Sequence, residues 1–108
     1  MGTIEYNKAV RDRIPEIIEQ SGDTCNVKTL SDSEFLEALE KKLEEELTEY
    51  QQSKSVEELA DILEVIYRIA KLKEVSKEEL ETARNNKVKT RGGFAKNLFL
   101  INKSESNS

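Results

Sequence analysis

The sequence contains no histidine, no tryptophan and one cysteine, Cys25, among its 108 residues. A single cysteine cannot form a disulfide within the chain, and without histidine or a second thiolate the usual zinc ligand sets are excluded. No hydrophobic run approaches the roughly 18 residues of a membrane-spanning helix, and the N-terminus lacks the apolar stretch of a signal peptide. These absences predict a cytoplasmic protein with no membrane partner.

Apolar side chains are also scarce. Charged residues of both signs make up 36% of the chain, which is typical of solvated helices rather than of a disordered chain. Hydrophobic residues make up only another 36%, so the core of a monomer would be thin. We therefore expect one domain, residues 1–108, that assembles as a homodimer or homotetramer and has a frayed tail from about residue 103.

Apolar residues at helical spacing predict four helices. A short helix is expected over residues 14–20, because Pro15 is tolerated only in a first turn. The pattern Ser-x-x-Glu, typical of a capping box, starts at Ser31, Ser55 and Ser76. Each occurrence introduces a longer helix, and the predicted ranges are 32–52, 56–73 and 77–90.

Two short segments outside these helices have strand-like patterns. Residues 24–30 alternate polar and apolar side chains, and residues 97–101 form a short apolar run. They could pair as a small two-stranded β ribbon beside the helices. The predicted fold class is mainly α, an antiparallel helical bundle with this ribbon, assembling as an oligomer.

The helix predicted over residues 32–52 carries acidic residues at unusual positions. Glu46 falls inside its apolar arc, Glu49 lies at the margin of that arc, and Glu45 points towards solvent. A glutamate within a leucine stripe must be paired, protonated or bound to a metal. The residues of that stripe are Leu36, Leu39, Leu43, Leu47 and Tyr50.

The helix predicted over residues 56–73 is apolar around most of its circumference. Such a helix must be covered on two sides, by its own chain and by a partner. Asp61 lies on its narrow polar stripe, whereas Glu58 lies across an apolar arc. Glu58 also stands three residues after Ser55, so its role could simply be that of a capping glutamate.

A chain reversal around residues 53–54 would bring four carboxylates together. Glu49 and Glu58 are equally far from that turn, and so are Glu46 and Asp61. Two unit charges about 5 Å apart repel by roughly 3 kcal/mol at an effective dielectric constant of 20. Protonation or a divalent cation would relieve this repulsion, and oxygen ligands without histidine favour Mg²⁺ first and Mn²⁺ second. Carboxylate-bound Mg²⁺ is typical of phosphate chemistry, although a solvated helix face is the other interpretation.

Basic residues gather near both ends of the chain, on either side of an acidic middle. Their side chains could hold phosphates, and the backbone of Gly92 and Gly93 could approach them closely. The alternatives are ordinary surface charge and a helix C-cap. A net charge of −5, without a basic face interleaved with aromatic residues, argues against a nucleic-acid partner.

Three stretches of the sequence resemble one family. Residues 42–49 (KLEEELTE) followed by residues 58–61 (ELAD) resemble the E-E-x-x-E and E-x-x-D signature of the all-α NTP pyrophosphohydrolases. These include MazG-like proteins, dimeric dUTPases and phosphoribosyl-ATP pyrophosphohydrolases. Residues 6–15 (YNKAVRDRIP) and 91–94 (RGGF) resemble a small single-domain branch, expected to act as house-cleaning enzymes for non-canonical nucleotides. The likeness extends over residues 6–101.

The resemblance implies a Mg²⁺-dependent hydrolase that cleaves nucleoside triphosphates between the α- and β-phosphates, giving a monophosphate and pyrophosphate. It also implies assembly into dimers or tetramers. The implied metal ligands are Glu46, Glu49, Glu58 and Asp61. The implied catalytic residues are Glu46 and Glu45, of which Glu45 orients or deprotonates the attacking water. The implied phosphate contacts are Lys8, Arg11, Arg13, Lys87 and Arg91.

Two alternatives to the house-cleaning function stay open. The first is the phosphoribosyl-ATP pyrophosphohydrolase of histidine biosynthesis, which would share the metal site but use one specific substrate. The second is a non-catalytic helical dimer that acts as an interaction module. In that case Glu58 would only cap its helix, and Glu49 and Asp61 would only be solvated.

Overall fold

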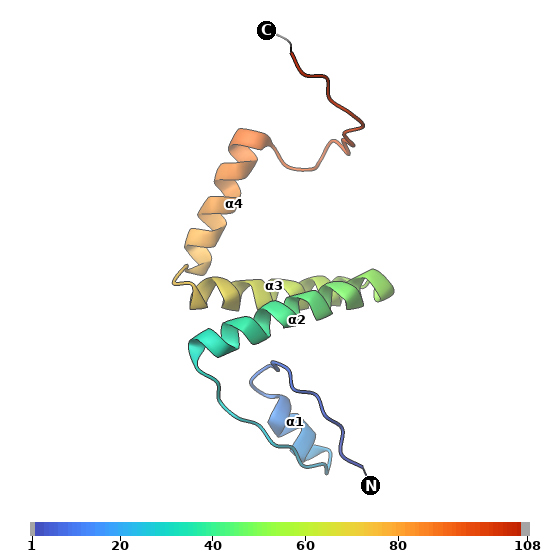
Figure 1. The fold of residues 1–108 in the computed structure, drawn as a ribbon, viewed down its shortest axis with the longest axis vertical. Helices are drawn as coiled ribbons and strands as arrows, with labels where there is room; N and C mark the ends of the chain where they lie inside the picture. The colour runs from blue at the N-terminus through green and yellow to red at the C-terminus, as the bar shows by residue number, and fades with distance from the viewer. Residues whose placement is uncertain (1, 107–108) are drawn as a thin grey trace. The chain divides into compact units, whose positions relative to one another are not determined.

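Four α-helices make up the regular structure of residues 2–106, the part of the chain that the computed structural model describes (Figure 1). Each helix agrees with its predicted range to within one residue at either end. The mainly α fold class is therefore confirmed. The helices are α1 (Ile14–Gln20), α2 (Asp32–Ser53), α3 (Val56–Leu72) and α4 (Lys77–Arg91).

Local hydrogen bonds define where α2 and α3 begin and end. The Ser31 hydroxyl accepts a hydrogen bond from the backbone N–H of Glu34, whose side chain accepts one from the backbone N–H of Ser31. Lys54 adopts a left-handed conformation (φ 59°) and ends α2. The Ser55 hydroxyl then accepts from the N–H of Glu58 and starts α3. The chain reversal predicted around residues 53–54 is thus confirmed.

α2 and α3 lie side by side and pack against each other (Figure 1). Leu39 of α2 and Val65 of α3 are buried against each other in the core. The two-residue connection makes this pair an antiparallel hairpin, because the chain has no room to cross over. Apolar residues that pack around the core are Phe35, Ala38, Leu43, Ile69 and Leu72.

The N-terminal arm, residues 2–13, has one anchor in this core. Ala9 is only 6% exposed and belongs to the same cluster as Leu39 and Val65. Asn7, two residues earlier, has a left-handed backbone (φ 48°), which asparagine tolerates better than most residues. The Ala9 methyl group, packed with Leu39 of α2 and Val65 of α3, is therefore the apolar anchor of the arm on the hairpin.

Enlarging this anchor is expected to destabilise the protein. An Ala9→Leu side chain would not fit beside Leu39 and Val65, and overpacking of this kind costs about 1–3 kcal/mol. Urea unfolding would measure the change. Ala83→Leu, on the exposed surface of α4, is the matched control and should change stability by less than about 0.5 kcal/mol. Equal stability of the Ala9 variant and the unaltered protein would mean that the arm is not packed on the hairpin.

The chain divides into two compact units, the first ending at Lys77 and the second beginning at Glu78. The C-terminal unit consists of α4, which has no buried residue, and the segment that follows it. Gly92 has a left-handed backbone (φ 84°), and its N–H donates to the carbonyl of Val88. This geometry is that of a helix C-cap, so the capping interpretation of the glycine pair is the one that the backbone supports.

The predicted β ribbon is not present within residues 2–106, because neither residues 24–30 nor residues 97–101 form a strand. A strand needs the backbone groups of a neighbouring strand, and an apolar pattern alone does not supply them. The apolar side chains of the second segment, from Leu98 to Ile101, remain more than 80% exposed. Residues 103–106 also form no helix or strand, and residues 107 and 108 of the predicted frayed tail lie outside the described residues.

Part of the surface of α3 is apolar. Val56 is 78% exposed, and Leu59 and Leu63 are each 46% exposed. α2 therefore covers one side of α3, and these three side chains remain on the surface of the single chain.

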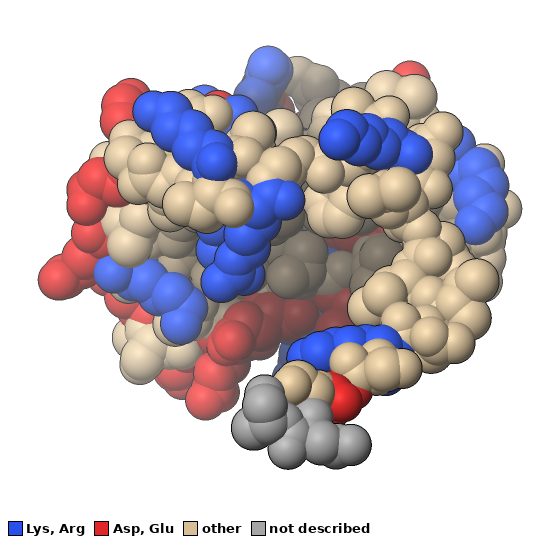
Figure 2. All heavy atoms as spheres, turned by 90° about the horizontal axis from the view of Figure 1, so that it is seen from above, with Lys and Arg blue, Asp and Glu red and all other residues tan. Residues whose placement is uncertain are grey.

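Charges of both signs are distributed over the molecule. Figure 2 shows Lys and Arg side chains and Asp and Glu side chains together on one face. Within residues 2–106, no helix combines the length and the hydrophobicity that crossing a membrane requires.

Candidate functional site

The α2–α3 hairpin brings together three of the predicted metal ligands. Glu46, Glu58 and Asp61 each contribute one carboxylate oxygen, and these oxygens lie within 4.8 Å of one another. Glu46 comes from α2, whereas Glu58 and Asp61 stand one turn apart near the start of α3. We call these three residues the acidic cluster.

Glu49, the fourth predicted ligand, lies outside this group of three within the described chain. It follows Glu46 by three residues and so projects about 60° away around the axis of α2. Its half-buried carboxylate still acts on its surroundings, because its charge helps to raise the pKa values of Glu58 and Lys8. Glu49 is thus a neighbour of the acidic cluster.

Glu46 is the most unusual member of the cluster. It is only 5% exposed, as its position inside the apolar arc of α2 predicted. Its Oε1 lies 3.3 Å from the Nζ of Lys42, but within residues 2–106 its Oε2 has no hydrogen-bond partner. Over the same residues, Oε2 of Glu58 also has none. A buried carboxylate oxygen without a donor is energetically costly, so a donor or a cation at these two oxygens would stabilise the cluster.

The side chain of Glu58 belongs to the cluster as well. The Glu34 side chain returns to its own N-cap residue, whereas that of Glu58 lies with Glu46 and Asp61. The Glu46 carboxylate, which accepts a hydrogen bond from protonated Glu58, raises the pKa of Glu58 to about 7. Burial and the charges of Glu49, Glu46 and Asp61 act in the same direction. A proton on Glu58 therefore supplies one donor that the cluster otherwise lacks.

This raised pKa predicts how the stability of the metal-free protein depends on pH. Folded Glu58 binds a proton more tightly than the unfolded carboxyl group, whose pKa is 4.5. Its contribution is therefore fully present below pH 4.5 and is lost as the pH rises through about 7. Thermal unfolding in EDTA should give a lower melting temperature at pH 8 than at pH 5.5.

Glu58→Gln separates this effect from other titrations. The amide stays neutral at every pH, so the variant should be more stable than the unaltered protein at pH 8. Its melting temperature should also fall less between pH 5.5 and pH 8. Identical pH profiles for the two proteins would contradict the raised pKa of Glu58.

The N-terminal arm places two basic side chains at the hairpin. The Nζ of Lys8 donates a hydrogen bond to Oε1 of Glu45 at 2.8 Å. The Nη2 of Arg11 donates to Oδ1 of Asp61 at 2.6 Å. Ala9, the buried anchor of the arm, lies between these two residues in the sequence. One basic side chain therefore reaches α2 and the other reaches α3.

Two residues of α2 have surroundings that the sequence did not predict. Glu45, expected to point towards solvent, is half-buried because Lys8 of the arm covers it. The hydrogen bond from Lys8 lowers the pKa of Glu45 and keeps it ionised. Lys42, which the sequence did not single out, lies 3.3 Å from Oε1 of Glu46 and 3.9 Å from Oε1 of Glu45. Its spacing of four residues from Glu46 is the signal that could have identified it.

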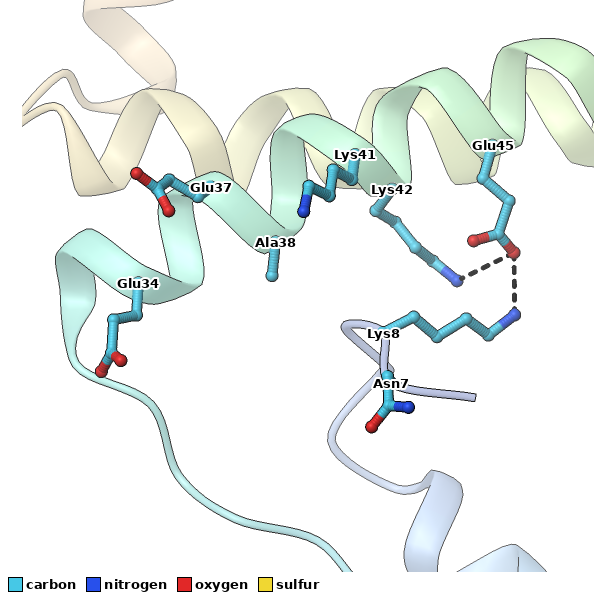
Figure 3. A pocket seen from close by; sticks show the side chains of 8 residues that line it. All are labelled: Asn7, Lys8, Glu34, Glu37, Ala38, Lys41, Lys42 and Glu45. Carbon is cyan, nitrogen blue, oxygen red and sulfur yellow. Dashed lines mark hydrogen bonds and ion pairs between the residues drawn. The ribbon is translucent and has the colours of Figure 1, made fainter. Parts of the chain in front are cut away.

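A pocket of about 180 Å³ lies between the arm and α2 (Figure 3). At one end, Lys8 from the arm and Lys42 from α2 both extend towards the Glu45 carboxylate. Lysine and glutamate side chains thus share the lining of the pocket. The lining residues are Asn7, Lys8, Glu34, Glu37, Ala38, Lys41, Lys42 and Glu45.

The other predicted phosphate contacts belong to other elements of the chain. Arg13 is paired with Glu16 in the first turn of α1, at 3.1 Å, and is largely exposed. Lys87 and Arg91 are exposed residues of α4, in the C-terminal unit. The structure therefore brings Lys8 and Arg11 to the hairpin, whereas Arg13 pairs with α1.

Comparison with known proteins adds one partial match. Over 40 residues the sequence is 58% identical to an uncharacterised protein of Mycolicibacterium smegmatis, a stretch that makes up 37% of this chain and 41% of that protein. The match thus spans less than half of the relative. No family model matches the sequence, and no solved structure matches it.

Proposed function

We propose that this protein is a cytoplasmic, Mg²⁺-dependent nucleoside triphosphate pyrophosphohydrolase. It would cleave the bond between the α- and β-phosphates and release a nucleoside monophosphate and pyrophosphate, with non-canonical nucleotides as substrates. The observation that carries the proposal is the buried Glu46, whose Oε2 has no hydrogen-bond partner in the described part of the chain and which shares an acidic cluster with Glu58 and Asp61. A surface of merely solvated glutamates would not bury one of them in this way.

The residues of the acidic cluster fit a hard divalent cation. The donor set consists of carboxylate oxygens only, which suits Mg²⁺ and secondarily Mn²⁺. Glu46, Glu58 and Asp61 would hold the ion, with Glu49 at the edge of the site. When bound, such an ion supplies Lewis-acid polarisation of a phosphate oxygen and lowers the pKa of water.

Around this centre, the chain's own side chains would bind and orient the reactants. Glu45 stays ionised because Lys8 donates a hydrogen bond to it, so it is suited to accepting a hydrogen bond from the attacking water. Its lowered pKa makes it a weak base, and we therefore assign it the orienting role. Lys8, Lys41 and Lys42 line the pocket beside α2 and would contact the outer phosphates.

The proposal includes assembly of the chain into a homodimer or homotetramer. Val56, Leu59 and Leu63 support this part, because they leave an apolar strip of α3 exposed in the single chain. The same strip favours the alternative of a helical interaction module. That alternative gives no reason why a carboxylate oxygen of Glu46 and one of Glu58 lack a hydrogen-bond partner among residues 2–106.

A nucleotide panel assayed for pyrophosphate release tests the proposed function. The panel contains canonical triphosphates, triphosphates with damaged bases and phosphoribosyl-ATP, each with Mg²⁺ and with EDTA. Mg²⁺-dependent release from damaged triphosphates would support the house-cleaning function, and release from phosphoribosyl-ATP alone would support the biosynthetic alternative. Absence of pyrophosphate release across the panel would refute the proposal.

A further inference from the structure

The N-terminal arm already supplies a cation to the acidic cluster. The Arg11 guanidinium bonds to Oδ1 of Asp61 at 2.6 Å, and Asp61 is one of the three carboxylates within 4.8 Å of one another. The Lys8 pair lies outside the cluster, on Glu45. Arg11 is therefore the arm's direct contact with the acidic cluster.

Arg11 and a divalent cation would compete for the same negative charge. Both are positive, so each raises the free energy of the other when both sit against Asp61. The Arg11 and Asp61 side chains are 55% and 38% exposed, so the guanidinium can leave without unfolding the surrounding structure. Ala9, buried two residues earlier, keeps the arm on the hairpin while the Arg11 side chain moves.

We propose that Arg11 is an internal counter-ion of the acidic cluster, which a divalent cation displaces from Asp61 and thereby releases to bind a nucleotide phosphate. This inference rests on the proposed function, because it takes the cluster to be a cation site. The planar guanidinium fork matches a phosphate as well as it matches a carboxylate, so one side chain can serve both partners. Because binding linkage is reciprocal, cation and nucleotide should then each strengthen the binding of the other.

Mn²⁺ binding followed by the EPR signal of the free ion tests this exchange without any measurement of activity. Arg11→Gln removes the competing charge and should bind Mn²⁺ at least about tenfold more tightly than the unaltered protein. A triphosphate analogue with a non-hydrolysable α,β-methylene bridge should strengthen Mn²⁺ binding in the unaltered protein, and by a clearly smaller factor in the variant. Arg84→Gln removes an arginine paired with Glu81 on α4 and is the matched control, expected to bind Mn²⁺ as the unaltered protein does.

Arg11→Lys provides a second variant that keeps the charge. It should bind Mn²⁺ within about threefold of the unaltered protein but gain less from the analogue, because an ammonium group lacks the bidentate fork. If Arg11→Lys gained as much Mn²⁺ affinity as Arg11→Gln, the counter-ion role of Arg11 would be overturned. Unchanged or weaker Mn²⁺ binding by Arg11→Gln would overturn the inference alone, whereas no Mn²⁺ binding by the unaltered protein would overturn the proposed function with it.

Discussion

Replacement of Glu46 by Gln is expected to reduce pyrophosphate release to below about 1% of the unaltered rate, even in saturating Mg²⁺. Residues that merely support a metal ligand contribute about 10–100-fold to affinity or activity, so loss of a ligand should cost at least the upper value. The variant should stay folded, because the amide has nearly the same shape and removes one of three mutually repelling charges. Its metal-free melting temperature should therefore not fall. Steady-state hydrolysis and circular dichroism measure the two properties.

Two further variants make this test specific. Asp61→Asn should lose activity to the same extent, because Asp61 belongs to the same cluster. Glu44→Gln changes the same side chain on an exposed position of α2 and should keep the unaltered rate. Near-normal turnover in Glu46→Gln or Asp61→Asn would show that the ligand assignment is wrong.

Mg²⁺ is expected to raise the melting temperature of the protein by roughly 10–20 °C when its concentration is about 100 times its dissociation constant. A ligand that binds only the folded state at that concentration adds about 2.7 kcal/mol of stability. For a domain of about this size, each 1 kcal/mol shifts the melting temperature by about 4–8 °C, so 2.7 kcal/mol corresponds to roughly 10–20 °C. The physical source is the relief of repulsion among Glu46, Glu58 and Asp61.

The same experiment distinguishes an enzyme from an interaction module. EDTA should reverse the stabilisation, and Glu46→Gln should abolish most of it. NaCl at matched ionic strength should not reproduce it. A protein whose acidic residues were only solvated would show equal melting temperatures in Mg²⁺ and in EDTA.

The helices could be predicted from the sequence because local residues determine where they begin and end. Ser31 caps α2, Ser55 caps α3, and both hydroxyls accept backbone hydrogen bonds from residues three positions later. Gly92 ends α4 with a conformation that glycine adopts readily. The ribbon could not be predicted correctly, since pairing of residues 24–30 with residues 97–101 depends on distant backbone groups that the local pattern does not specify.

The acidic cluster was also accessible from the sequence, but only in part. The turn at residues 53–54 and helical spacing were sufficient to bring Glu46, Glu58 and Asp61 together. The surroundings of Glu45 could not be predicted in this way, because a helical wheel considers one helix and the arm approaches from elsewhere in the chain. The positions of Lys8 and Arg11 follow from the burial of Ala9, which no motif or charge pattern indicated.

The attachment of the N-terminal arm also makes it sensitive to ionic strength. One alanine and two partly exposed ion pairs hold the arm, whereas apolar packing holds α2 against α3. The Debye length shortens from about 10 Å at 0.1 M salt to about 3 Å at 1 M, so salt weakens the ion pairs far more than the apolar contacts. Concentrated salt should therefore loosen the arm while the hairpin stays folded, and amide hydrogen exchange should accelerate around residues 8–11 before it does so in the two helices.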